Sequence, residues 1–112
     1  MITILCSQDM IELAEYLAEG TDISITSNFE QLRAEIKSGS VSKIVVIHGA
    51  VNCSTVKKGL YVHAKTCYEA LKKEFPHLKV KVMDGWPWDI PSKDFLLLPE
   101  SLKNLRQAIE LM

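Results

Sequence analysis

The chain has 112 residues with 13 basic and 14 acidic side chains, and its formal net charge of -1 gives no electrostatic footprint for nucleic-acid binding, which would need a basic face. Hydrophobic residues make up 47% of the chain, which suits one folded domain over residues 1–112, and no apolar run approaches the roughly 20 residues of a membrane span. Met1 is followed at once by an apolar run without a basic leader, and the cysteines lack CxxC spacing. We therefore expect a reduced, cytoplasmic protein.

The first part of the chain alternates strand and helix patterns. Ile2–Cys6 is an apolar run that predicts a strand, and Asp22–Thr26 alternates as a strand near the edge of a sheet does. A helix is predicted after each strand, with Asp9 and Ser27 as the N-caps. Both helices are expected to end at a glycine, Gly20 and Gly39.

The densest β-branched run is Lys43–His48, which is apolar on both faces and is followed by Gly49. A strand that does not alternate is covered on both sides, so we predict that this run is the central strand of a parallel sheet. In open α/β sheets, ligands bind beyond the carboxyl ends of the strands. A pocket in this protein should therefore involve His48 and its neighbours.

The next pattern is helical again. Apolar residues at intervals of three and four predict a helix that ends before Pro76 and starts either at Ser54 or near Gly59. The segment Leu78–Met83 then alternates apolar residues with lysines. This alternation predicts a strand with one face partly exposed to solvent.

The last part of the chain begins with a segment that has no period. Asp84–Lys93 holds two prolines and predicts a loop that has room for a single helical turn. Asp94–Leu98 is expected to be a buried strand, and a terminal helix follows from Ser101 with Arg106 exposed. The expected apolar stripe of that helix is Leu102, Leu105, Ile109 and Met112.

The order of elements, β-α-β-α-β-α-β-loop-β-α, predicts an α/β three-layer sandwich with a five-stranded parallel sheet. Right-handed crossovers then give the strand order 2-1-3-4-5.

In its order of elements, the chain resembles the receiver domain of bacterial response regulators. The segment Phe95–Pro99, followed by a helix with Leu102, Leu105 and Ile109 at Leu-x-x-Leu-x-x-x-Ile spacing, is similar to a receiver's last strand, Lys-Pro step and last helix. Ile44–His48, then Gly59-Leu60 at the start of a helix, give a second match. The resemblance implies a flavodoxin-like fold and a regulatory role.

The residues that a receiver uses for phosphorylation are replaced in this chain. At the acidic pair, the phosphoacceptor Asp, the Ser/Thr and the Lys of a receiver, the sequence has Cys6-Ser7-Gln8, His48, Met83-Asp84 and Leu98. Phosphoryl transfer needs a carboxylate nucleophile and a cation that neutralises phosphate charge. The resemblance therefore implies a pseudo-receiver that is not phosphorylated on aspartate, needs no cofactor or metal, and has a loop in place of the fourth helix.

Three residues near the predicted strand ends leave a second function open. A small enzyme or ligand-binding protein would use His48, Cys53 and Asp84, with the histidine as general base and the cysteine as nucleophile. The simpler interpretation is a histidine satisfied at the rim of the sheet and a cysteine in ordinary loop chemistry. His63 and Cys67 have metal-ligand spacing, but no second pair completes a tetrahedral site.

Trp86 and Trp88 flank Pro87 in the predicted loop. Tryptophan is enriched at interaction hot spots, so the pair predicts a binding surface, while the alternative is a lid that folds back over the sheet. We expect at least one of the two rings to be exposed and to contact a second copy or another protein. By the resemblance, the partner-binding residues are Trp86, Trp88, Phe95, Leu102 and Arg106. The predicted function is a non-catalytic protein-interaction domain.

Overall fold

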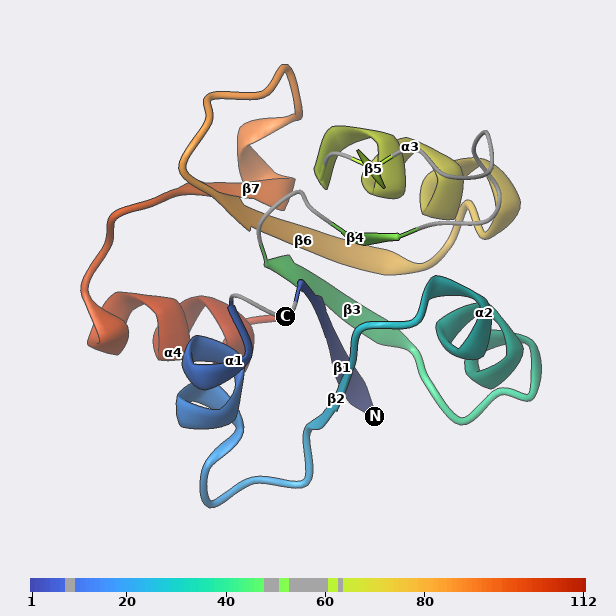
Figure 1. The fold of residues 1–112 in the computed structure, drawn as a ribbon, viewed down its shortest axis with the longest axis horizontal. Coiled ribbons are helices and arrows are strands. Elements are labelled where there is room, and N and C mark those ends of the chain that lie inside the picture. Colours follow the sequence, from blue (N-terminus) through green and yellow to red (C-terminus); the bar gives the residue numbers. More distant parts are fainter. Residues whose placement is uncertain (8–9, 48–50, 53–60, 63) are drawn as a thin grey trace.

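The computed structural model describes residues 1–7, 10–47, 51–52, 61–62 and 64–112. Five parallel strands form one sheet in the order β2-β1-β3-β6-β7, which is the predicted flavodoxin-like order 2-1-3-4-5 (Figure 1). The strands are β1 (Ile2–Cys6), β2 (Ser24–Thr26), β3 (Lys43–Ile47), β6 (Lys79–Asp84) and β7 (Phe95–Leu97).

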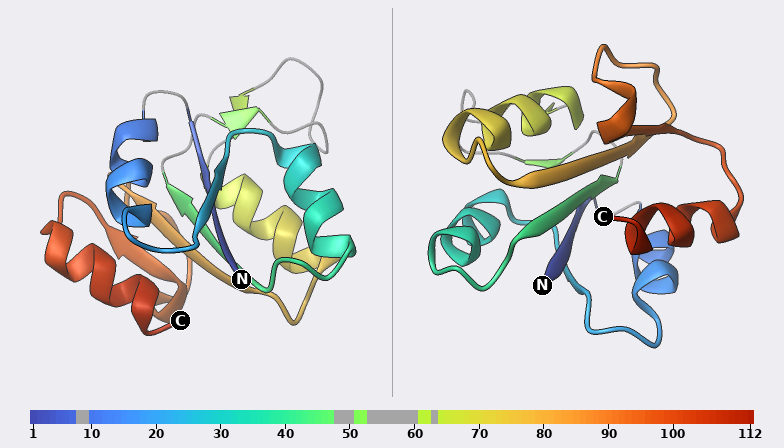
Figure 2. Two further views of the ribbon diagram at one scale, coloured as in Figure 1. Left: turned by 90° about the horizontal axis from the view of Figure 1, so that it is seen from below. Right: turned by 180° about the vertical axis from the view of Figure 1, so that it is seen from behind.

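Helices cover both faces of the sheet (Figures 1 and 2). The helices α1 (Ile11–Ala18) and α4 (Leu102–Glu110) pack on one face, and α2 (Phe29–Lys37) and α3 (Ala64–Glu74) pack on the other. Because successive side chains of a strand point to opposite faces, β3 supplies alternate residues to the two cores. All four of its apolar residues are buried, which confirms the prediction of a central strand.

The third helix begins later than the sequence pattern suggested. Tyr61–Val62 forms the short strand β5, which pairs antiparallel with β4 (Val51–Asn52), and α3 starts at Ala64. An aromatic residue followed by a β-branched residue favours extended backbone. The helix therefore begins only after this short strand. The two starts considered for this helix, Ser54 and Gly59, lie outside the described residues.

The cap of α2 was predicted one residue too early. Asn28, and not Ser27, is the N-cap, because its side chain accepts a hydrogen bond of 3.0 Å from the backbone N–H of Gln31. Asp9, the other predicted cap, lies outside the described residues. Two predicted helix ends are confirmed by glycines in the left-handed region, Gly20 at φ 75° and Gly39 at φ 83°.

A loop with a single 3-10 turn, η2 (Ser92–Asp94), connects β6 to β7, so the predicted reduction of a fourth helix to a loop is confirmed. In the terminal helix, Leu105 and Ile109 are buried as predicted, but Leu102 is 40% exposed. Leu102 lines an open hollow beside Tyr16 and does not pack on the sheet, which accounts for that exposure.

The expected exposure of Arg106 was wrong. Its side chain is half-buried against α1, where it donates a 2.8 Å hydrogen bond to the carbonyl of Tyr16. The guanidinium also lies over the ring of Tyr16, 4.6 Å from its centroid. The packing of α4 on α1 therefore covers a residue that helical periodicity alone places in solvent.

Candidate functional site

The loop that carries the two tryptophans begins at Asp84, the last residue of β6. This residue is only 4% exposed, and its carboxylate accepts two hydrogen bonds from the loop that follows it. The backbone N–H of Trp86 donates to Oδ1 at 3.3 Å, and Nε1 of Trp88 donates to Oδ2 at 2.6 Å. One buried carboxylate thus fixes both the backbone of the loop and one indole ring.

The two tryptophans have different environments. Trp88 is half-buried and packs against the core between the sheet, α2 and α3, whereas Trp86 is 63% exposed. Their ring centroids are 6.3 Å apart, with an angle of 54° between the planes. One ring therefore acts as the lid and the other faces solvent, which confirms the expectation that at least one tryptophan is exposed.

A second large apolar side chain is exposed at the same corner of the molecule. Leu97, the last residue of β7, is 49% exposed. In the register of the sheet it pairs with Asp84, and Asp84 precedes Trp86 by two residues. β7 is also an outer strand of the described sheet. We call Trp86, Leu97 and the outer edge of β7 the Trp corner. The expectation of a buried strand over Asp94–Leu98 was therefore wrong for Leu97, because an outer strand has a partner on one side only.

The remaining predicted partner-binding residues fall into two groups. Phe95 is half-buried and packs on the same core as Trp88. Leu102 and Arg106 lie instead on the α1–α4 side, where they line a separate hollow of about 510 Å³ together with Tyr16. The structure thus brings Asp84, both tryptophans and Phe95 together but places the two α4 residues on the opposite layer.

A hydrogen bond between α3 and η2 supports the far end of the loop. The hydroxyl of Tyr68 donates to Oδ2 of Asp94 at 2.5 Å, directly before β7 begins. Burial of the phenol, together with the neighbouring carboxylate, raises the pKa of Tyr68 to about 12. The neutral phenol thus anchors the return of the loop to the sheet at all ordinary pH values.

Of the three residues considered for a small enzyme or ligand-binding protein, the structure describes Asp84. His48 and Cys53 lie outside the described residues, while the carboxylate of Asp84 accepts hydrogen bonds from the tryptophan loop. Cys67 is buried in the core against the sheet, and its predicted metal partner His63 also lies outside the described part. Among the described residues, no group of three or more His, Cys, Asp or Glu side chains is arranged to hold a metal ion.

Comparison of the chain with family models, curated protein sequences and solved structures gives no match. In the part of the chain that the structure describes, no helix combines the length and the apolar character needed to cross a membrane.

Proposed function

We propose that this chain is a non-catalytic protein-interaction domain that binds its partner through the Trp corner. The observation that carries the proposal is the 63% exposure of Trp86 in a loop whose backbone is fixed by a buried carboxylate. Because the backbone of Trp86 is already fixed, less backbone entropy is lost when a partner covers the ring. Such preorganised aromatic residues are common hot spots of protein interfaces.

The neighbourhood of Trp86 supports the same function. Leu97, which is opposite Asp84 in the sheet, adds exposed apolar area near the start of the loop, and the outer edge of β7 adds backbone groups that a partner can pair with. Exposed apolar side chains that lie together in this way are typical of interaction sites. The partner is a second copy of this chain or another protein.

We further infer that the domain is a pseudo-receiver with a regulatory role in a bacterial cytoplasm. The strand order supports this inference, and so do the side chains at the strand ends. The end of β1 carries the buried Ser7, and the end of β6 carries Asp84, which is engaged with the tryptophan loop. These groups suit a scaffold that keeps the architecture of a receiver and has lost its chemistry.

The test compares three baits, the natural chain, Trp86→Ala and Asp89→Ala, in quantitative pull-downs and in sedimentation velocity runs. Asp89 is exposed in the same loop, so its variant is a control for changes to the loop other than loss of the ring. We expect one partner, or self-association, that the natural chain and Asp89→Ala retain and Trp86→Ala loses. A partner set and an oligomeric state that are the same for all three baits would refute the proposal.

A further inference from the structure

The first half of β6 has two unlike faces. Val80 and Val82 are buried in the core between the sheet, α2 and α3. Successive side chains of a strand point to opposite faces, so Lys79 and Lys81 point to the face that carries α1 and α4. Met83, two residues further along, is buried in the core on that face. This face of the sheet is therefore apolar and covered near the end of β6 but basic at its start.

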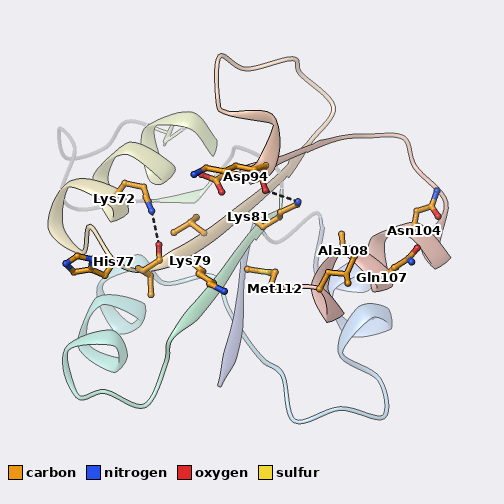
Figure 3. A pocket seen from close by; sticks show the side chains of 13 residues that line it. Lys72, His77, Lys79, Lys81, Asp94, Asn104, Gln107, Ala108 and Met112 are labelled. Carbon is orange, nitrogen blue, oxygen red and sulfur yellow. Dashed lines mark hydrogen bonds between the residues drawn. The ribbon is translucent and has the colours of Figure 1, made fainter.

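A groove of about 540 Å³ lies at this basic start of β6 (Figure 3). One side is lined by α4 and the two residues after it, with Ala108 and Met112 among them. The other side is lined by α3, the turn that follows it and η2, with Lys72 and His77 among them. Figure 3 shows Lys79 between the two sides. The groove therefore brings together side chains from elements that are far apart in the sequence.

The groove is basic although the whole chain has a formal net charge of -1. Its basic side chains are Lys72, His77, Lys79, Lys81 and Lys93. Asp94 is the single acidic side chain among the described residues that line it, and that carboxylate already accepts the hydroxyl of Tyr68. The positive charge of the groove is therefore not balanced by acidic side chains of its own walls.

Two of these lysines make hydrogen bonds to neutral groups. Lys72 donates to the carbonyl of Leu78 at 2.9 Å, and Lys81 donates to the carbonyl of Lys93 at 3.1 Å (Figure 3). These bonds hold the ammonium groups in place without neutralising their charge. An anionic ligand thus meets cations that have already lost part of their side-chain freedom, so less entropy is lost on binding.

The α4 side of the groove also has an apolar part. Leu111 lines the groove and is 80% exposed, which makes it the most exposed large apolar side chain among the described residues. Ala108 and Met112 are half-buried beside it on the same wall. A ligand that matches both parts of the groove carries carboxylates for the lysines and an apolar group for Leu111.

We propose that this groove binds an acidic segment of a partner protein that also carries an apolar side chain. Carboxylates of the segment lie against Lys79 and the fixed ammonium groups of Lys72 and Lys81. The apolar side chain packs on Leu111 and Met112. The contacts are made by side chains and not by strand pairing, because Val80 is buried and η2 lies beside this stretch of β6.

The composition and the shape of the groove favour a protein segment over other polyanions. Proteins that bind single-stranded nucleic acid stack the bases on aromatic rings, whereas no Phe, Tyr or Trp is among the described residues that line this groove. A hollow between two walls also admits a narrow chain more readily than the flat surface of an anionic membrane. The site does not include Trp86 or Leu97, so it holds or fails independently of the proposed function.

The probe is a fluorescein-labelled peptide of repeated Glu-Leu-Glu units, titrated with the full chain and followed by fluorescence anisotropy. We expect saturable binding that weakens as salt is added. A peptide of Lys-Leu-Lys units reverses the charge, and a peptide of Glu-Ser-Glu units lacks the apolar side chains. Each should bind about tenfold more weakly than the first peptide, because each matches only one part of the groove.

Two exposed positions test the two parts of the groove. Lys79→Glu should weaken binding of the Glu-Leu-Glu peptide about threefold to tenfold. Lys103→Glu makes the same charge change on α4 outside the groove and should leave the affinity unchanged. Leu111→Ser should also weaken binding about threefold to tenfold, whereas Leu102→Ser, at the other end of α4, should not.

Trp86→Ala should bind the Glu-Leu-Glu peptide as the natural chain does, so failure of the Trp corner and failure of this site can be told apart. Equal binding of the Glu-Leu-Glu and Lys-Leu-Lys peptides would overturn the proposal, and so would unchanged affinity in both Lys79→Glu and Leu111→Ser.

Three further outcomes would assign the groove to a different occupant and would also overturn the proposal. A single-stranded oligonucleotide, or vesicles that contain phosphatidylserine, would displace the peptide at equal or lower concentration. Alternatively, the chain alone would self-associate at low salt in sedimentation velocity runs and Lys79→Glu would abolish this association, which would identify a second copy as the ligand.

Discussion

Nε1 of Trp88 lies 2.6 Å from Oδ2 of Asp84, and this hydrogen bond joins the end of β6 to the loop between β6 and β7. The carboxylate is nearly inaccessible to solvent, so its interaction with the indole is poorly screened. The same carboxylate also receives the backbone N–H of Trp86. The backbone that carries the exposed ring of Trp86 is therefore fixed by a buried charge at the end of β6.

Removing this carboxylate should destabilise the fold. We expect Asp84→Ala to lower the free energy of unfolding by about 2–3 kcal/mol, because the indole N–H loses a charged acceptor and is left half-buried. Asp89→Ala, an exposed position in the same loop, should stay within about 0.5 kcal/mol of the natural chain. Chemical denaturation measures both values. A double-mutant cycle with Trp88→Phe that shows no coupling energy would contradict the role given to this hydrogen bond.

Acrylamide should quench the two tryptophans unequally. Trp86 is exposed and Trp88 is half-buried, so the natural chain should show one accessible and one protected component of fluorescence. Trp86→Ala should remove the accessible component and change the free energy of unfolding by no more than about 0.5 kcal/mol. Trp88→Phe should leave the accessible component in place. Equal protection of both rings in a monomer would show that the loop is only a lid.

Acetyl phosphate or beryllofluoride with Mg²⁺ should leave the protein unchanged. Of the strand ends that the structure describes, β1 is followed by the buried Ser7 and β6 ends in Asp84, whose carboxylate holds the tryptophan loop. Binding of Mg²⁺ favours carboxylates together with several waters, and neither strand end offers such a cluster. Intact-mass measurement and tryptophan fluorescence provide the check. A magnesium-dependent phosphoryl adduct would contradict the pseudo-receiver interpretation.

Stability at acidic pH should depend on an ion pair between α2 and α3. Arg33 donates to the two carboxylate oxygens of Glu74 at 2.6 Å each, and this hydrogen bonding lowers the pKa of Glu74. A lowered folded-state pKa gives stability that is complete above the ordinary glutamate pKa and is lost as the pH falls through the folded value. Arg33→Gln should therefore flatten the loss of stability on acidification, as measured by thermal unfolding across pH. Lys103→Gln is the control and should leave that dependence unchanged.

The alkaline limit of stability should report on Tyr68. Its pKa is raised to about 12, first by burial and then by Asp94, so the contribution of the neutral phenol is full below the ordinary tyrosine pKa and is lost as the pH rises through about 12. Asp94→Asn should lower the titration midpoint of this phenol only in part, because burial remains. Ultraviolet absorbance of tyrosinate measures the midpoint, and Tyr68→Phe assigns it. A midpoint that Asp94→Asn leaves unchanged would contradict the contact.

Local patterns in the sequence were sufficient to predict the sheet. A run that is apolar on both faces has only one stable environment, the middle of a covered parallel sheet, and all the apolar residues of β3 are buried. The connections between strands then allow few topologies, and the structure has the strand order that right-handed crossovers predict. The same logic does not extend to short segments. Tyr61–Val62 and Asn28 depend on pairing and capping partners that the helical pattern does not reveal.

Only the tertiary structure decided how the candidate sites are built. The sequence marked Trp86 and Trp88 equally, and their different exposures arise because the carboxylate of Asp84 and the adjacent core hold one ring and leave the other in solvent. Arg106 is covered because α4 packs on α1. Lys79–Lys81 of β6 has no partner in β7, because β7 begins three residues after the start of β6 in the register of the sheet. Periodicity along one segment cannot encode these relations, since each depends on contacts between segments far apart in the chain.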